Sequence, residues 1–426
     1  MAKYIFISGS YDPYPTANGV CAKAIERGLK NARNEVVYIV PRHNLNQAFV
    51  ENINGNTVYF VPKSIDEVHK NISLLLRNSL PRPEKGVLKV AYLFVRILFK
   101  LLALFRFKST REVAFNKYKA QSVSIIKSLI ENENPYAIVT FSVPFDSHLF
   151  THEALLKMKN KPKWFIFMFD AHSYRDGTEI EAKRFREQEL LCFREADKCF
   201  LLDVLETDYS QYNEFKDKIQ YFHLPFLQIP LKVHYFGNCI NTELNKINFL
   251  FAGTLYDQGR PVDYLVDYIE EFAKHNSQFH LIGKIYPENL EKILSLNSKY
   301  NGIVKYYGRR ERSFVLESLT QADCLINISN NNSNQIPSKI LEYIGMVKPI
   351  VTFSRTDFDA SSLYLDRYPL SLVIDERKTP SMDGVQQTIQ FLDRIDLENI
   401  KVEDLRPAFE GLIEDDVVVS IIKHFS

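Results

Sequence analysis

The sequence predicts an α/β protein built from two doubly wound, parallel-sheet domains, and three observations support this prediction. The chain has 426 residues, more than the roughly 250–300 at which a single hydrophobic core stops growing. Hydrophobic residues make up 46% of it and charged residues 25%, which is the balance of an ordinary soluble globular protein. Short apolar runs alternate with helical patterns in both halves, as is typical of parallel strands buried on both faces.

The first half, residues 1–228, contains apolar runs of strand length that are bounded by Gly, Pro, Asn or Asp and separated by helical patterns. These runs are 4–8, 36–40, 57–61, 137–141, 164–169 and 198–202. Their alternation with helical patterns predicts a first Rossmann-like domain.

A proline-marked stretch, 223–230, separates the halves, and the alternation resumes after it. The second set of runs is 247–251, 279–282, 304–307, 324–328, 349–353 and 370–374. This predicts a second Rossmann-like domain over 229–403, followed by a largely helical segment, 404–426, which we expect to pack back on the first domain. Two such domains are expected to face a cleft at the carboxyl ends of both sheets, where parallel sheets bind ligands.

Charge and cysteine content narrow the class of protein. The formal net charge of +1 gives no global reason to expect a nucleic acid partner. The cysteines, Cys21, Cys192, Cys199, Cys239 and Cys324, lack the close spacing of a zinc or redox motif and are interpreted as reduced thiols. Residues 1–10 resemble a strand and a turn rather than a signal peptide. We therefore expect a cytoplasmic protein.

The densest candidate site lies between the run 324–328 and the helix that we expect to begin at Ser338. A polar loop there delivers a helix N-terminus, whose free N–H groups favour a phosphate. Ser338 can act as cap or hydrogen-bond donor, and Lys339 adds a positive charge. Glu342, one turn further along, could accept both hydroxyls of a ribose. The competing interpretation is an ordinary capped helix without a ligand.

A second signal follows the run 247–251. Gly253 is expected in a tight turn, where it would let a ligand approach the backbone. Arg260 stands just before a helix that starts with proline and could form a bidentate pair with a phosphate. Taken alone, Arg260 is better explained as a solvated surface charge.

The order of these elements is more specific than any one of them. After Gly253 and Arg260 come the segments 304–308, 319–326, 336–344 and 348–351. This order and spacing resembles the carboxyl-terminal domain of retaining GT-B glycosyltransferases of the family 4 type. That large family builds bacterial cell-surface polysaccharides and includes sucrose synthases.

The resemblance implies roles for individual residues. The basic phosphate-binding residue of the family corresponds to Arg260, and its helix-start phosphate cradle corresponds to Ser338 and Lys339, which Pro337 precedes. Its ribose-binding glutamate corresponds to Glu342. A second glutamate of the family, which reaches the hydroxyls of the donor sugar, is replaced here by Asn334. The sugar is therefore not named by the sequence.

The first half carries weaker signals for the acceptor side. Asn18 and Gly19 follow the first strand at the place of the family's small-residue loop, before a helix that we expect to begin near Cys21; a simple proline-rich turn is the alternative. Asp170 and His172 come at the carboxyl end of the run 164–169. A similar Asp or His in the family faces the reacting sugar, although a lone histidine is more often structural.

Residues 87–107 form an apolar, basic stretch without an acidic residue. Spanning a bilayer would cost roughly 2.5–3.5 kcal/mol for each of Arg96 and Lys100, whereas lying in the interface lets both side chains snorkel. We favour a peripheral anchor on the inner face of the cell membrane. A helix buried in the first domain with its charges at the rim is the alternative.

The resulting hypothesis is sugar transfer from a nucleoside diphosphate sugar to a hydroxyl of a saccharide or lipid-linked acceptor. The resemblance implies retention at the anomeric carbon. Positive charge at Arg260 and Lys339 would stabilise the leaving diphosphate, so no metal or cofactor is expected; Asp357 and Asp359 are interpreted as helix-capping residues. Two alternatives stay open: a nucleotide-sugar epimerase of the same fold, and an inactive nucleotide-sugar-binding subunit.

Overall fold

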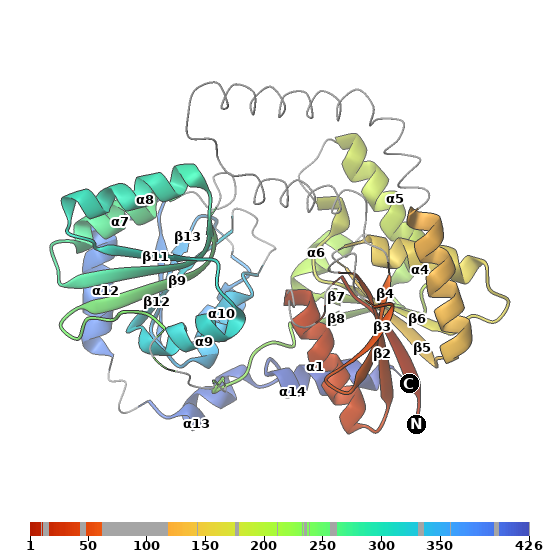
Figure 1. The fold of residues 1–426 in the computed structure, drawn as a ribbon. Coiled ribbons are helices and arrows are strands. Elements are labelled where there is room, and N and C mark those ends of the chain that lie inside the picture. Colours follow the sequence, from red (N-terminus) through yellow and green to blue (C-terminus); the bar gives the residue numbers. More distant parts are fainter. Residues whose placement is uncertain are drawn as a thin grey trace, which may run out of the picture. The chain divides into compact units, whose positions relative to one another are not determined.

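The computed structural model describes residues 1–9, 11, 17–42, 48–61, 118–142, 144–174, 179–210, 212–231, 233, 237, 239–255, 262–330, 336–357, 359–395 and 400–425. The chain divides into two compact units (Figure 1). The first consists of Met1–Leu202 and Asp208–Tyr221, and the second of Asp203–Thr207 and Phe222–Ser426. The domain limits at 228 and 403 and the return of 404–426 onto the first domain stay predictions.

The first unit is built on an eight-stranded sheet with the strand order β3-β4-β2-β1-β5-β6-β7-β8. Its strands are β1 Lys3–Ile7, β2 Glu35–Pro41, β3 Val50–Ile53, β4 Asn56–Val61, β5 Ala137–Phe141, β6 Lys163–Met168, β7 Lys198–Leu202 and β8 Ile219–Phe222. Strand β1 pairs in parallel with both β2 and β5. Because the chain order reverses between β1 and β5, the sheet has a topological switch point there, which is where doubly wound sheets bind ligands.

Stacked aromatic side chains fix the middle of this sheet. The rings of Phe141 and Phe167 stack at 5.2 Å, and those of Phe167 and Phe200 at 4.5 Å, which joins β5, β6 and β7. The helices up to β8 are α1 Ala17–Asn31, α4 Asp146–Leu156, η1 His172–Tyr174, α5 Glu179–Glu195, η2 Asp203–Leu205, α6 Glu206–Tyr209 and η3 Asn213–Phe215. The stacked rings therefore join three neighbouring strands, whose carboxyl ends lead into the loops.

The second unit contains a six-stranded parallel sheet with the order β11-β10-β9-β12-β13-β14. Its strands are β9 Ile247–Leu255, β10 Ser277–Ile285, β11 Val304–Gly308, β12 Cys324–Ile328, β13 Ile350–Ser354 and β14 Ser371–Asp375. The order reverses between β9 and β12. The crevice of this sheet is therefore expected at the carboxyl ends of those two strands.

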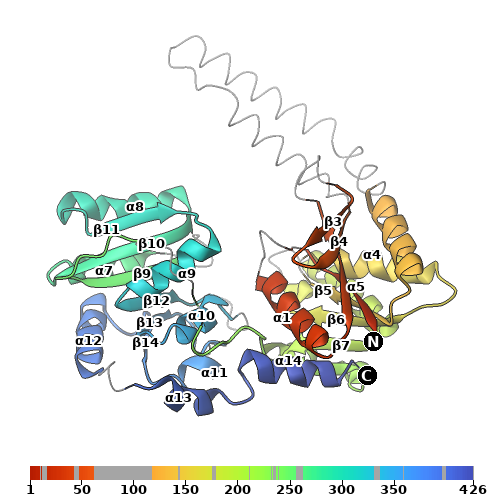
Figure 2. The same cartoon turned by 60° about the horizontal axis from the view of Figure 1, so that its bottom comes forward.

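Helices cover both faces of the second sheet (Figure 2). The helices that follow β9 in the chain are α7 Asp263–Phe272, α8 Pro287–Lys299, α9 Arg312–Gln321, α10 Lys339–Gly345, α11 Ser362–Leu365, α12 Ser381–Arg394, α13 Val402–Leu405, η5 Arg406–Phe409 and α14 Glu414–Lys423. Apolar side chains of α7, α8 and α12 form one buried cluster with the strands. Helices α9 and α10 lie on the other face (Figures 1 and 2).

The predicted fold class is confirmed, because each apolar run coincides with a strand of one of the two sheets. Segment 404–426 is also largely helical, and Pro407 falls in the 3-10 turn η5. The sequence analysis missed two edge strands, β3 and β8. Strand β3 forms an antiparallel hairpin with β4 across Asn54 and Gly55, both with positive φ, as a tight hairpin turn requires.

Two local predictions were wrong. Helix α1 begins at Ala17 and not near Cys21, so Asn18 and Gly19 lie in its first turn and not in the preceding loop. Gly253 does not form a turn. It lies inside β9 opposite Gly283 of β10, and a Cβ atom on Gly283 would overlap the carbonyl oxygen of Gly253. The glycine pair therefore serves a close approach of two backbones.

Candidate functional site

The centre of the second unit's candidate site is the carboxylate of Glu342 on α10. Its side chain is 2% exposed. Arg312 at the start of α9 donates a hydrogen bond from Nη1 to one carboxylate oxygen, and Lys339 Nζ donates to the other at 2.5 Å. Burial of a carboxylate is costly unless cations and hydrogen bonds compensate. The two cations keep a charged group in a nearly dry position.

Pro337 and Ser338 form the entry into α10. Pro337 is buried, and its carbonyl oxygen accepts the N–H of Ile340 at 2.9 Å. Ser338 makes no side-chain hydrogen bond that caps the helix, so the capping role considered for it is not found. Its half-buried hydroxyl remains a donor that a ligand could use.

Contacts at both ends of the helix fix α10. The hydroxyl of Tyr343 accepts the backbone N–H of Ala252 in β9 at 2.9 Å. At the C-terminal end, Leu231 N donates to Gly345 O at 2.7 Å. A Cβ atom on Gly345 would overlap the carbonyl oxygen of Gln228. The segment after β8 therefore packs against α10 so closely that only glycine fits at its end.

Arg260 and Asn334 are outside the described residues. Asp357 pairs with Arg377, while Asp359 accepts hydrogen bonds from the hydroxyl of Ser329 and the N–H of Ser361, just before α11. Asp359 thus holds the backbone that enters α11. No cluster of three or more His, Cys, Asp or Glu that could bind a metal occurs among the residues that the structure describes.

Arg312 was not predicted as a residue of this site. It lies within the stretch that resembles the known family, yet no local motif distinguishes it from the neighbouring Arg309 and Arg310. Its partner is 30 positions away. Only the parallel sheet brings the start of α9 beside α10, so no spacing in the sequence could have indicated this pair.

In the first unit, the switch point brings together α1 and the loop after β5. Asn18 Nδ2 donates to the carbonyl oxygen of Ser142 at 2.8 Å, and the Ser142 hydroxyl accepts the N–H of Phe169 at 3.1 Å. Gly19 is buried directly beside Asn18. The predicted small-residue segment therefore does lie at the carboxyl ends of the strands, although on a helix.

His172 occupies the turn that follows β6, as predicted, with the half-buried Asp170 two residues before it. The residue is 8% exposed, and its ring stacks on that of Phe145 at 4.1 Å and contacts the tilted ring of Phe185 at 4.3 Å between ring centres. Nε2 lies 3.2 Å from Gln188 Oε1. Because an amide oxygen only accepts, Nε2 is the donor in this contact.

A buried glutamate shapes this turn. Glu189 Oε1 accepts the N–H groups of His172 at 2.6 Å and Ser173 at 3.1 Å, and the Tyr209 hydroxyl at 2.8 Å. Burial raises the pKa of the Glu189 carboxyl even against these donors. Glu189 on α5 therefore orients the backbone that presents His172.

A second histidine, His148 on α4, lies behind Phe145 and was not singled out from the sequence. Its Nδ1 is 2.7 Å from the Thr140 hydroxyl, which also accepts Trp164 Nε1–H at 2.9 Å. Burial and the nearby His172 lower the pKa of His148 to about 3. His148 is thus a neutral part of the core beneath the turn.

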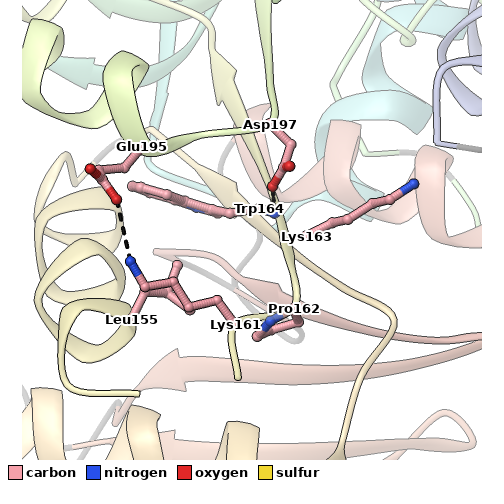
Figure 3. Close-up of a pocket in the computed structure, with 7 residues that line it drawn as sticks. All are labelled: Leu155, Lys161, Pro162, Lys163, Trp164, Glu195 and Asp197. Carbon is pink, nitrogen blue, oxygen red and sulfur yellow. Dashed lines mark hydrogen bonds and ion pairs between the residues drawn. The ribbon is translucent and has the colours of Figure 1, made fainter. Parts of the chain in front are cut away.

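One pocket of the first unit lies at the opposite edge of the sheet, at the amino ends of β6 and β7 (Figure 3). Its volume is about 220 Å³. Its polar lining is largely paired: Lys161 contacts Glu195 at 3.4 Å, and Asp197 accepts the backbone N–H of Trp164 at 2.8 Å. Since doubly wound sheets bind ligands at their carboxyl ends, this pocket is not part of the candidate site.

The remaining predictions concern cysteines and the membrane. All five cysteines are free thiols. Among the described residues, no helix has the length and apolar character that crossing a membrane requires. The stretch 87–107 lies outside those residues, so its interpretation as an anchor stays a prediction.

Comparison with known proteins agrees with this geometry. Residues 246–362 match the family model described as Glycosyl transferases group 1. This span contains β9, Arg312, Lys339 and Glu342. No curated protein matches the chain by sequence.

Solved structures with similar folds span the whole chain. Sucrose-phosphate synthase from Thermosynechococcus elongatus has 12% identity and a TM-score of 0.65, with 100% of this chain and 98% of that chain covered. A variant of Staphylococcus aureus TarM in complex with fondaparinux, α-GlcNAc-glycerol and UDP has 12% identity and a TM-score of 0.62, with 100% of both chains covered.

A third similar structure is the UDP-GlcNAc 2-epimerase from Methanocaldococcus jannaschii, with 11% identity, a TM-score of 0.55 and 99% of each chain covered. At such identities these likenesses describe the fold, while the family match describes the second unit. The chain is therefore a glycosyltransferase with the GT-B fold, whose residues 246–362 form a glycosyl transferases group 1 domain.

Proposed function

We propose that this glycosyltransferase moves a sugar from a nucleoside diphosphate sugar to a hydroxyl acceptor, with retention at the anomeric carbon. The carboxylate of Glu342, buried between two cations at the switch point of the second sheet, is the observation that carries the proposal. A carboxylate in this position is suited to accept the two ribose hydroxyls of a nucleotide. The bound UDP of the TarM structure makes UDP the first nucleotide to test.

In this proposal, the leaving diphosphate is stabilised by charge and hydrogen bonds from the protein. Lys339 and Arg260 supply positive charge, and Ser338 supplies a hydroxyl. Fixed groups of this kind stabilise charge as it develops, so neither a metal nor a cofactor is required. Transfer that is unchanged after incubation with EDTA supports this, and transfer restored only by added Mg²⁺ contradicts it.

The first unit would hold the acceptor and the reacting sugar. His172, whose ring contacts Phe145 and Phe185, and Asp170 are the candidates that face the sugar. Asn18 and Gly19 are the candidates near the phosphates and acceptor. We propose a saccharide or lipid-linked oligosaccharide as acceptor, in cell-surface polysaccharide synthesis. Gly253 and Pro337 would shape the donor side, and Asn334 would take the place of the family's sugar-binding glutamate.

The decisive experiment is a thermal-shift panel of nucleoside diphosphates, because a ligand that binds only the folded state raises the melting temperature. We expect stabilisation by at least one of them. The substitution Lys339→Met should weaken it, whereas Lys299→Met on α8, which removes an exposed pair with Glu270, should not. If no nucleoside diphosphate raises the melting temperature, the proposed donor site is contradicted.

Chemistry is tested by hydrolysis of the nucleotide sugar without acceptor, compared between wild type and Arg260→Ala. The epimerase alternative is favoured by the similarity to the UDP-GlcNAc 2-epimerase fold, and formation of a C2 epimer would support it. Binding without any turnover would instead support an inactive subunit.

We also propose that the enzyme is cytoplasmic and attaches to the inner membrane face through residues 87–107. Deletion of 87–107, and separately Arg96→Glu with Lys100→Glu, should release the protein from sedimented membranes. Unchanged sedimentation of both variants would contradict the anchor.

A further inference from the structure

We propose that Arg312 is a positioning residue for nucleotide recognition, holding the Glu342 carboxylate in the orientation that accepts the ribose diol. The inference rests on the proposed function, because it assigns the ribose to Glu342. It adds a residue to the site that no motif in the sequence indicates.

The hydrogen-bond inventory of the carboxylate supports this role. An ionised carboxylate has about four acceptor positions, two on each oxygen. Arg312 occupies one position on Oε1 and Lys339 one on Oε2. Counted over the residues that the structure describes, one acceptor position on each oxygen is left, which matches the two adjacent hydroxyls of a ribose.

The two cations are not equivalent. Lys339 lies three positions before Glu342 on the same short helix and moves with it. Arg312 comes from α9, and its guanidinium also lies 5.6 Å from the ring centre of Phe226, a buried residue of the segment that follows β8. Arg312 therefore ties Glu342 to two other elements, and its rigid fork suits orientation better than a flexible ammonium.

Burial distinguishes this pair from an ordinary surface ion pair. The Arg312 side chain is 38% exposed and could reach solvent, whereas the Glu342 side chain is 2% exposed. Exposed pairs contribute little, but removing one partner of a buried carboxylate leaves an undercompensated charge. Without Arg312, the carboxylate is expected to turn toward Lys339 and lose its alignment for the diol.

The test compares two ligands that differ only in the ribose hydroxyls. Dissociation constants are measured for the diphosphates of uridine, adenosine, guanosine and cytidine and for their 2′,3′-dideoxy forms. Wild type should prefer the ribonucleotide that binds best by about tenfold or more over its dideoxy form, as expected for hydrogen bonds to a charged group. Arg312→Met should lose most of this preference while binding the dideoxy form about as well as wild type.

Two further variants complete the design. Arg312→Lys, which keeps the charge without the fork, should show an intermediate preference. Arg310→Met, which removes an exposed arginine beside Phe314 in the same segment, should keep the full preference. A purely structural role would weaken both ligands equally in Arg312→Met and would not be graded by Arg312→Lys.

The outcomes separate the two proposals. If wild type binds no nucleoside diphosphate, the proposed function fails, and the inference fails with it. If wild type distinguishes ribose from dideoxyribose and Arg312→Met does so equally well, or weakens both ligands by the same factor, the proposed function stands and the role of Arg312 is refuted.

Discussion

The two units share one strand order around their switch points but differ in the chemistry at the carboxyl ends of their strands. In the first unit, the imidazole of His172 packs against Phe145 and Phe185, and Glu189 accepts hydrogen bonds from the backbone of its turn. In the second unit, the carboxylate of Glu342 is held between Arg312 and Lys339. The same scaffold thus presents a histidine among aromatic rings in one unit and a cluster of charged side chains in the other.

This difference suggests how the proposed reaction divides between the units. A nucleoside diphosphate carries the charge of the reaction, and the cations lie in the second unit. A sugar acceptor is neutral and rich in hydroxyls, which suits aromatic faces and neutral hydrogen-bonding groups. Experiments that separate nucleotide binding from transfer therefore test the contrast directly.

The largest expected effect comes from Glu342→Gln compared with His172→Asn. Glu342→Gln should weaken binding of the nucleoside diphosphate by roughly hundredfold, since two hydrogen bonds to a charged acceptor become weaker ones. His172→Asn should leave this binding unchanged and lower the rate of transfer. Calorimetric titration and a transfer assay measure the two quantities. Equal loss of binding in both variants would show that the two units do not differ in this way.

A second prediction tests whether the units unfold separately. Gly283→Ala should destabilise the second unit by about 2 kcal/mol, because the new Cβ overlaps a backbone oxygen and overpacking is costly where neither strand can move. The only tryptophan of the chain, Trp164, lies in the first unit, so its fluorescence reports the unfolding of that unit alone. We expect the unfolding temperature reported by tryptophan fluorescence to stay unchanged, while calorimetry shows a lower unfolding temperature for the second unit. Parallel shifts of both signals would mean one cooperative unit.

A third prediction concerns stability in acid and compares two fully buried histidines, one from each unit. Burial lowers the pKa of His148 to about 3 and that of His280 to about 4. Because both values lie below the unfolded value near 6.5, their neutral forms stabilise the fold above that pH, and this stability is lost as the pH falls. Between pH 7 and pH 5 each histidine should cost about 2 kcal/mol.

The variants His148→Gln and His280→Gln should each flatten this acid dependence, the first by tryptophan fluorescence and the second by hydrogen exchange in β9 and β10. If both variants still lose stability steeply in acid, the acid dependence arises from carboxylates and not from these histidines.

The smallest expected effect is that of Ser338→Ala. Since this serine makes no capping hydrogen bond, its loss should leave the melting temperature of the free protein unchanged. Nucleoside diphosphate binding should weaken by a few-fold, the usual contribution of one hydroxyl donor. A lowered melting temperature without ligand would show that the hydroxyl stabilises the helix after all.

Sequence patterns predicted the strands of both sheets well and the residues of the site less well. The central strands are buried on both faces and therefore appear as continuous apolar runs, whereas β3 alternates between exposed and half-buried residues and could not be recognised in the same way. Lys339 and Glu342 come after the loop that follows β12, and His172 comes just after β6, so their position along the chain located them. Arg312 and Glu189 act on residues far along the chain or on backbone groups, and only the folded structure brings them together.

The segment after β8 has a consequence for the order in which the protein is made. Leu227 accepts a hydrogen bond from Glu414 N at 2.8 Å, and Gln228 donates to the Glu414 carboxylate at 2.7 Å. Gln228 and Glu414 are separated by 186 positions in the chain. A ribosome must therefore complete the entire second sheet before these contacts can form, so the pairing of this segment with the start of α14 is among the last parts of the unit to be assembled during synthesis.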